Sequence, residues 1–174
     1  MIKNYKVVIT GAESTGKSAV SRYLANYFDT IWLPEFARDF VENLNRPYIY
    51  EDVEFIAKTQ INQEANMLKK ANKFLFIDTS LIITKIWFKV VYNKIPNWLE
   101  EKICETKPNF YLLCNNDLEW IPDKVRENGG EMRQKLFDMY LAEIINYSVD
   151  YEVIKGVGEQ RFLNAVSAVK NYFE

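Results

Sequence analysis

The chain reads Gly11-Ala12-Glu13-Ser14-Thr15-Gly16-Lys17-Ser18 between an apolar run and a stretch with helical spacing. This segment fits the pattern G-x-x-x-x-G-K-[ST] of phosphate-binding loops. Glycines let a backbone fold tightly round an anion, and the positive dipole end of the following helix favours negative charge. The alternative is a glycine-rich turn that only caps a helix. The residues predicted to bind a nucleoside triphosphate are Gly11, Glu13, Ser14, Thr15, Gly16, Lys17, Ser18 and Ala19.

Working outward from this loop, short apolar runs alternate with segments of helical periodicity. The runs predict strands over 5–10, 30–33, 74–77, 109–114 and 151–154. The periodic segments predict helices over 17–28, 35–44, 51–71, 81–92, 97–105, 131–147 and 159–173. Such alternation is typical of a parallel sheet covered by helices on both faces. We expect an α/β three-layer sandwich with a five-stranded parallel sheet, the P-loop NTPase fold in its kinase-like form.

The 174 residues favour one domain, 1–174, because domains mostly run to about 100 to 200 residues. The stretch 117–130 is polar, contains Pro122 and Gly129-Gly130, and predicts a mobile loop, so we expect a lid at about 117–133. Hydrophobic residues make up 48% of the chain, which argues against wholesale disorder.

Composition excludes several classes of protein. With 22 Lys+Arg against 24 Asp+Glu, the chain lacks the basic footprint of a general nucleic-acid binder. It contains no His, which excludes a His-based triad, His metal ligands and a His proton shuttle. Cys104 and Cys114 are too few for a disulfide scaffold, so free thiols are expected. No apolar stretch is long enough to span a bilayer and no signal peptide is evident, so we expect a cytoplasmic protein.

Asp78 directly follows the apolar run 74–77. A carboxylate at the end of that strand would face the metal held by Ser18, directly or through water, because Mg²⁺ keeps several waters. A helix N-cap is the other interpretation of Asp78. A GTPase is disfavoured, because Thr79, Ser80 and Leu81 follow without the glycine of a D-x-x-G motif, and 115–117 lacks an N-K-x-D motif.

A small kinase also needs a carboxylate near the acceptor hydroxyl and cations on a closing lid. Glu35 follows the second strand, at the sheet edge where ligands bind, and Arg38 lies one helical step further on. Arg126 and Arg133 flank Gly129-Gly130, as the cations of a hinged lid would. The alternatives are a charge that favours a helix N-terminus for Glu35, and solvated surface positions for the arginines.

Two tryptophans are candidates for substrate binding. Trp120 begins the lid, where an exposed indole offers a stacking surface, with an additional attraction for a cationic ring. Trp87 lies on the helix after Asp78 and is the second candidate for substrate binding. A position in the hydrophobic core is the alternative for both.

The chain resembles the ribosylnicotinamide kinase domain of NadR-type proteins, a branch of the P-loop kinases. Four segments carry this resemblance, namely Gly11 to Ser18, 33–40, 76–87 and 112–133. The resemblance covers nearly the whole chain. It implies transfer of the ATP γ-phosphate to the 5′-hydroxyl of nicotinamide riboside, which gives nicotinamide mononucleotide. The roles that it implies are ATP and Mg²⁺ binding by Lys17, Ser18 and Asp78, catalysis by Glu35 and Arg38, ring packing by Trp120, and phosphate binding by Arg126 and Arg133.

Ser80 stands where the family often has a second Asp, and Asp123-Lys124-Val125-Arg126 replaces an Asp-Gly that commonly precedes the lid arginine. Two other functions therefore remain open, a kinase for another nucleoside or small metabolite and an ATP-sensing module without catalysis. The oligomeric state is also open, although Tyr92, Trp98 and Tyr172-Phe173 suggest an exposed apolar patch. By its position after the last strand, the loop 156–161 is the expected adenine-side loop.

Overall fold

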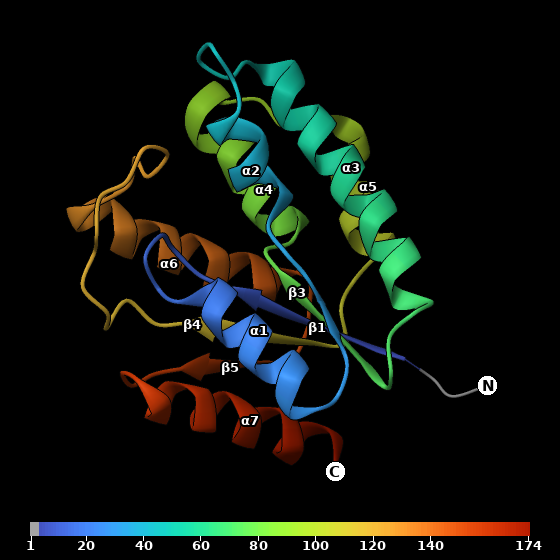
Figure 1. Ribbon diagram of the computed structural model, residues 1–174. Coiled ribbons are helices and arrows are strands. Elements are labelled where there is room, and N and C mark those ends of the chain that lie inside the picture. Colours follow the sequence, from blue (N-terminus) through green and yellow to red (C-terminus); the bar gives the residue numbers. More distant parts are fainter. Residues whose placement is uncertain (1–3) are drawn as a thin grey trace.

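The computed structural model describes residues 4–174, and a five-stranded parallel sheet forms its centre (Figure 1). The order of the strands is β2-β3-β1-β4-β5, and all four pairings are parallel. The predicted α/β fold is therefore confirmed, and each strand agrees with its predicted range to within a residue at either end. The strands are β1 Tyr5–Thr10, β2 Ile31–Leu33, β3 Phe74–Asp78, β4 Phe110–Cys114 and β5 Tyr151–Ile154.

Helices cover both faces of the sheet, and each face has its own apolar core. Successive side chains of a strand point to opposite faces, so Val7 and Ile9 pack on one core while Val8 packs on the other. The first core is closed by α1 (Lys17–Tyr27) and α7 (Glu159–Phe173). The second is closed by α3 (Tyr50–Leu68), α4 (Leu81–Trp87), α5 (Asn97–Glu105) and α6 (Gly130–Asn146).

Most helices, α2 (Phe36–Glu42) among them, agree with their predicted ranges to within two residues, and two segments differ more. The helix predicted over 81–92 is α4 followed by a π-helical turn, η1 (Phe88–Tyr92), which ends at Asn93 with a positive φ of 48°. The helix predicted over 51–71 ends at Leu68. At its start, the Asp52 carboxylate accepts a hydrogen bond from the Ile49 amide (2.8 Å), which satisfies a backbone donor at the N-cap.

The predicted aromatic patch does not form as a single surface. Tyr92 and Trp98 pack against the core under α3, and the Trp98 indole donates to Glu54 Oε1 at 2.7 Å. Tyr172 instead stacks on Phe110, with ring centroids 4.2 Å apart, and Phe173 packs against Phe74. These pairs contact opposite faces of the sheet, so the expected patch was wrong.

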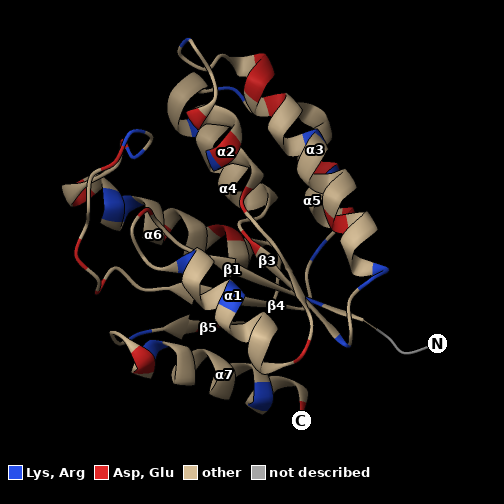
Figure 2. Ribbon diagram, in the orientation of Figure 1, with Lys and Arg blue, Asp and Glu red and all other residues tan. Residues whose placement is uncertain are grey.

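Charged residues lie mainly on the helices and loops, while the strands carry few (Figure 2). Acidic and basic residues both occur on the loop between β4 and α6, which is the predicted lid. Cys104 is exposed and Cys114 is buried, and both are free thiols as expected. Across residues 4–174, every helix is too short or too polar to cross a membrane.

Candidate active site

The loop between β1 and α1 turns sharply at the carboxyl end of the central strand. Gly11 has a φ of +144°, and a Cβ there would lie 2.8 Å from the carbonyl oxygen of Cys114 on β4. Gly16, with a φ of +78°, is the N-cap of α1. The buried Thr15 hydroxyl donates to the Ala12 carbonyl at 2.8 Å and braces the turn. These residues form the loop-and-helix arrangement that binds phosphate groups.

Lys17, Ser18 and Asp78 lie together at the base of this loop. Ser18 Oγ donates to Asp78 Oδ2 at 2.5 Å, and Lys17 Nζ donates to the Ala12 carbonyl at 2.9 Å. Asp78 is 1% exposed, and this burial raises the pKa of its carboxyl, although Lys17 and the hydroxyls of Ser18 and Thr79 lower it. The N-cap of α4 is Ser80, so Asp78 does not cap that helix. A hydroxyl next to a carboxylate is a donor set that suits Mg²⁺.

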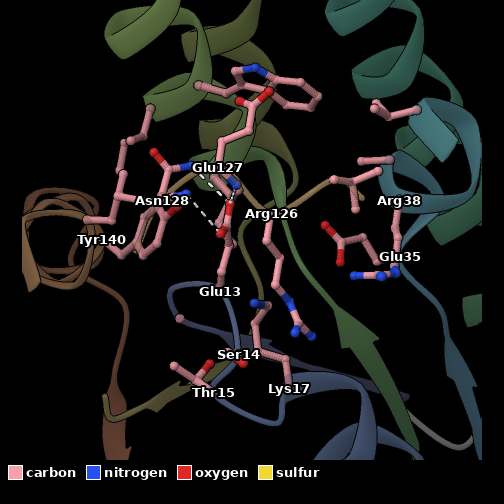
Figure 3. Close-up of a pocket in the computed structure, with 18 of the residues that line it drawn as sticks. Glu13, Ser14, Thr15, Lys17, Glu35, Arg38, Arg126, Glu127, Asn128 and Tyr140 are labelled. Atoms are coloured by element: carbon pink, nitrogen blue, oxygen red, sulfur yellow. Dashed lines mark hydrogen bonds between the residues drawn. The ribbon is translucent and has the colours of Figure 1, made fainter. Parts of the chain in front are cut away.

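A cavity of about 410 Å³ opens beside the phosphate loop, between α2, α4 and the lid (Figure 3). Its volume is in the range of small-molecule sites. All eight residues predicted to bind the triphosphate line it, together with Glu35, Arg38, Trp87 and Arg126. Residues not predicted from the sequence also line it, namely Ala37, Val41, Tyr48, Ile83, Ile86, Val90, Val91, Val125, Glu127, Asn128, Leu136 and Tyr140.

Glu35 occupies the N-cap position, just before the first residue of α2, and its side chain faces the cavity. Its side chain does not cap the helix, and within residues 4–174 its carboxylate has no hydrogen bond or ion pair. Burial raises the pKa of Glu35, Lys17 opposes that effect, and the charge of Asp78 adds to it. A carboxylate with free oxygens in a cavity is available to accept a proton from a bound hydroxyl.

The lid crosses the cavity and brings Arg126 to its wall. Arg126 Nη1 donates to the Ile121 carbonyl at 2.5 Å, and Arg126 Nε lies 3.2 Å from Asp123 Oδ2. The same Asp123 oxygen accepts from Arg38 Nη2 at 2.7 Å. The two arginines that line the cavity, Arg38 and Arg126, therefore share one carboxylate.

Arg133 and Trp120 do not line the cavity. Arg133 is 7% exposed and donates to three backbone carbonyls, those of Glu13 (2.9 Å), Ser14 (2.9 Å) and Leu118 (2.7 Å). Trp120 Nε1 lies 3.4 Å from Glu13 Oε2, and its ring faces Gly129. The structure thus places these two predicted site residues between the lid and the phosphate loop.

An aromatic pair lines the cavity at the last residue of α4. Trp87 contacts Tyr48 edge to face, with ring centroids 4.9 Å apart and an interplanar angle of 81°. Tyr48 lies in the connection between α2 and α3, and no motif in the sequence points to it. Ser80 lies elsewhere, buried with its hydroxyl 3.3 Å from that of Tyr111.

The expected adenine-side loop lies beside the start of the lid. Asp117 Oδ1 accepts from Arg161 at 2.6 Å, and Asp117 Oδ2 accepts from the Gly156 amide at 2.7 Å. Arg161 also donates to the carbonyls of Gly156 (2.8 Å) and Asn115 (2.9 Å). The loops after β4 and β5 are thus tied together next to Gly16.

Comparison with solved structures shows the same fold elsewhere. A crystal structure of NadR protein in complex with NR superposes with a TM-score of 0.81 at 20% identity, over 97% of this chain and 51% of that one. Deoxyadenosine kinase from M. mycoides superposes with a TM-score of 0.68 at 12% identity, over 95% of this chain and 99% of that one.

Comparison of sequences gives a closer match. The trifunctional NAD biosynthesis/regulator protein NadR of Salmonella typhimurium (strain LT2) is 30% identical over 170 residues. The match covers 94% of this chain but only 42% of that relative, so the chain spans about two fifths of the relative's length. A family model described as an AAA domain (AAA_28) matches residues 6–161. The chain therefore belongs to this AAA domain family and has the fold of the P-loop kinases.

Proposed function

We propose that the chain is an ATP-dependent kinase that phosphorylates the 5′-hydroxyl of nicotinamide riboside to give nicotinamide mononucleotide. The observation that carries the proposal is the unpaired Glu35 carboxylate, which faces the cavity opposite the phosphate loop with Lys17. The likeness to NadR, whose solved structure contains NR, supports nicotinamide riboside as the acceptor.

In this proposal the phosphate loop and Lys17 bind the triphosphate of ATP. The loop at the N-terminus of α1 supplies backbone donors, and Lys17 exchanges its bond to Ala12 for the β- and γ-phosphates. Mg²⁺, held by Ser18 and Asp78, would neutralise charge on the phosphates. Arg126 on the lid, whose side chain lies near Lys17 in Figure 3, would stabilise the charge on the transferred group.

The acceptor occupies the other part of the cavity, with its hydroxyl at Glu35. Glu35 orients this hydroxyl and takes its proton as the oxygen bonds to the γ-phosphorus and the bond to ADP breaks. The proton thus ends on Glu35, and the electrons of the broken bond leave with ADP. Arg38, one helical turn from Glu35, contributes positive charge at the same edge.

The ring of the acceptor packs against the aromatic pair of the cavity wall. Trp87 and Tyr48 offer an apolar, electron-rich surface there, and the aliphatic side chains of Val90 and Val91 extend it. A cationic pyridinium ring gains cation–π attraction at such a surface, which a neutral base does not. This favours nicotinamide riboside over an uncharged nucleoside of similar size.

The test is a coupled assay of ADP release with ATP, Mg²⁺ and a panel of acceptors: nicotinamide riboside, adenosine, deoxyadenosine, uridine and thymidine. Lys17→Ala serves as the inactive control. Turnover with nicotinamide riboside, and a product with the mass of nicotinamide mononucleotide, is the expected result.

Two other outcomes would replace the proposal. Turnover only with another nucleoside would indicate the second candidate, a different nucleoside kinase, which the structural likeness to deoxyadenosine kinase favours. Tight ATP binding without turnover on any acceptor would indicate a nucleotide-sensing module.

A further inference from the structure

The side chain of Glu13, inside the phosphate loop, points to the lid and not to the base of the loop (Figure 3). Glu13 Oε1 accepts from the amide of Glu127 (3.2 Å) and from Asn128 Nδ2 (3.0 Å). Glu13 Oε2 accepts from the amide of Asn128 (3.0 Å) and lies 3.4 Å from the indole nitrogen of Trp120. One carboxylate thus binds four donors, all of them on the lid.

The backbone of the same two loop residues binds the lid as well. Arg133, at the start of α6, donates to the carbonyls of Glu13 and Ser14 at 2.9 Å each. Ser14 Oγ accepts from the amide of Ile121 at 3.0 Å. Positions 13 and 14 are variable positions of the motif G-x-x-x-x-G-K-[ST], whose phosphate chemistry depends on its backbone and on Lys17. The contacts of the Glu13 and Ser14 side chains with the lid are therefore not required for phosphate binding by the loop.

From these contacts we propose that Glu13 is a positioning residue, which docks the lid on the phosphate loop and thereby sets the distance between Arg126 and Lys17. Arg126 directly precedes Glu127 in the chain and lines the cavity that Lys17 also lines. Fixing the backbone of Glu127 and Asn128 therefore fixes the base of the Arg126 side chain. The inference rests on the proposed function, since it concerns the geometry of phosphoryl transfer.

The carboxylate suits this role because it only accepts hydrogen bonds. Both backbone amides, the Asn128 amide group and the indole are donors, so each bond is strengthened by the negative charge. A glutamine would keep one acceptor oxygen and turn a donor NH₂ toward the other donors. An alanine would remove all four bonds, so the two variants form a graded series.

The experiment compares Glu13→Gln and Glu13→Ala with Glu131→Gln, a matched control. Glu131 lies in the exposed first turn of α6, and within residues 4–174 its side chain has no hydrogen bond or ion pair. Four quantities are measured: kcat, KM for ATP, the rate of ATP hydrolysis without acceptor, and amide exchange by NMR. In the exchange experiment, the amides of Val125 and Arg126, which donate to Asp123 at 3.0 Å, are the internal reference.

We expect kcat to fall at least about tenfold in Glu13→Ala and less in Glu13→Gln, because small displacements of a catalytic group are costly. KM for ATP changes less than about threefold, since the loop backbone is intact. Hydrolysis of ATP relative to transfer rises, because an undocked lid admits water. The amides of Glu127 and Asn128 exchange faster, while those of Val125 and Arg126 do not.

An unchanged kcat in Glu13→Ala, or unchanged exchange at Glu127 and Asn128, would overturn the inference. A fall in activity accompanied by equal loss of exchange protection across β1, β3 and β4 would also overturn it, because it would indicate general unfolding. If the wild type does not phosphorylate nicotinamide riboside, the proposed function fails separately. The Glu13 variants are then compared with the wild type by their kcat for the acceptor that the enzyme does phosphorylate, or by their rate of ATP hydrolysis without acceptor.

Discussion

Arg38 Nη2 lies 2.7 Å from Asp123 Oδ2, so an ion pair joins α2, which follows Glu35, to the lid. Burial works against ionisation of Asp123, but the bonds from Arg38 and from the amides of Val125 and Arg126 lower its pKa to about 2. The aspartate therefore stays charged at every pH at which the protein is expected to work. The ion pair between Arg38 on α2 and Asp123 on the lid therefore does not depend on pH in that range.

Asp123→Asn should weaken this link without unfolding the turn, because the amide oxygen can still accept from Val125 and Arg126. The pair is partly exposed, with side-chain exposures of 36% and 25%, and such pairs are worth less than about 1 kcal/mol. We expect kcat to fall about two- to fivefold, measured by steady-state kinetics. Asp39→Asn, an exposed change on the same helix, is the control and should have no effect. Equal activity of both variants would show that the link is dispensable.

Glu35→Gln should lower kcat by about 10² or more while ATP still binds, because the amide cannot take the proton of the acceptor hydroxyl. Single-turnover rates and the dissociation constant of an ATP analogue separate the two effects. Full activity of the Gln variant would make Glu35 a structural residue, and the proposed mechanism would then be wrong.

The pH dependence of the reaction should report the same carboxyl. Burial, opposed by Lys17 and assisted by Asp78, raises the pKa of Glu35. As the pH falls through that raised value, Glu35 becomes protonated and kcat declines, at a higher pH than an ordinary glutamate near 4.3 would give. A rate profile of the wild type checks this. The low residual rate of Glu35→Gln should lack that decline.

Stability should change in the opposite sense to activity. A carboxyl whose pKa is higher in the folded than in the unfolded state costs stability above the unfolded pKa, since the unfolded chain then releases its proton more readily. Glu35→Gln removes that cost, so its Tm at pH 7 should exceed that of the wild type. The difference should shrink as the pH falls toward the unfolded value near 4.3. Calorimetry at several pH values measures it, and a lower Tm at pH 7 would contradict the expectation.

How much of the fold and of the candidate site could be predicted depends on how far apart in the sequence the interacting residues are. Continuous apolar runs mark buried parallel strands directly, and the glycine pattern of 11–18 marks the phosphate loop, so both were predicted from local sequence. The contacts of Glu13 with Asn128 and of Tyr48 with Trp87 join residues far apart in the chain. No local pattern encodes such partners, and these contacts became visible only in the folded chain. The π-helical turn at Phe88–Tyr92 was missed because its apolar residues fit an ordinary helix equally well.

Trp87 and Trp120 were both candidates for substrate binding, and they lie in different surroundings. Trp87 lines the cavity with Tyr48, whereas Trp120 contacts Glu13 and Gly129. Trp87→Leu should raise KM for the acceptor about tenfold, since aromatic and cation–π contacts contribute on the order of 1 kcal/mol each. Trp120→Phe keeps an aromatic ring against Gly129 and should leave acceptor KM within about twofold. A larger increase of the acceptor KM in Trp120→Phe would indicate that Trp120 contacts the ring of the acceptor.

Arg126 and Arg133 were expected to share one role in binding phosphates, and the structure gives them different environments. Arg126 lines the cavity, whereas the guanidinium of Arg133 is buried against three backbone carbonyls. Removing a buried donor leaves those carbonyls unpaired, at about 1 to 3 kcal/mol each. Arg133→Met should therefore lower Tm by several degrees, with activity falling as the phosphate loop loosens. Arg126→Met should leave Tm unchanged and lower kcat at least about tenfold, because an attraction to the transferred phosphoryl is lost. Thermal unfolding and kinetics on the same samples separate the two residues, and an unchanged Tm in Arg133→Met would contradict its structural role.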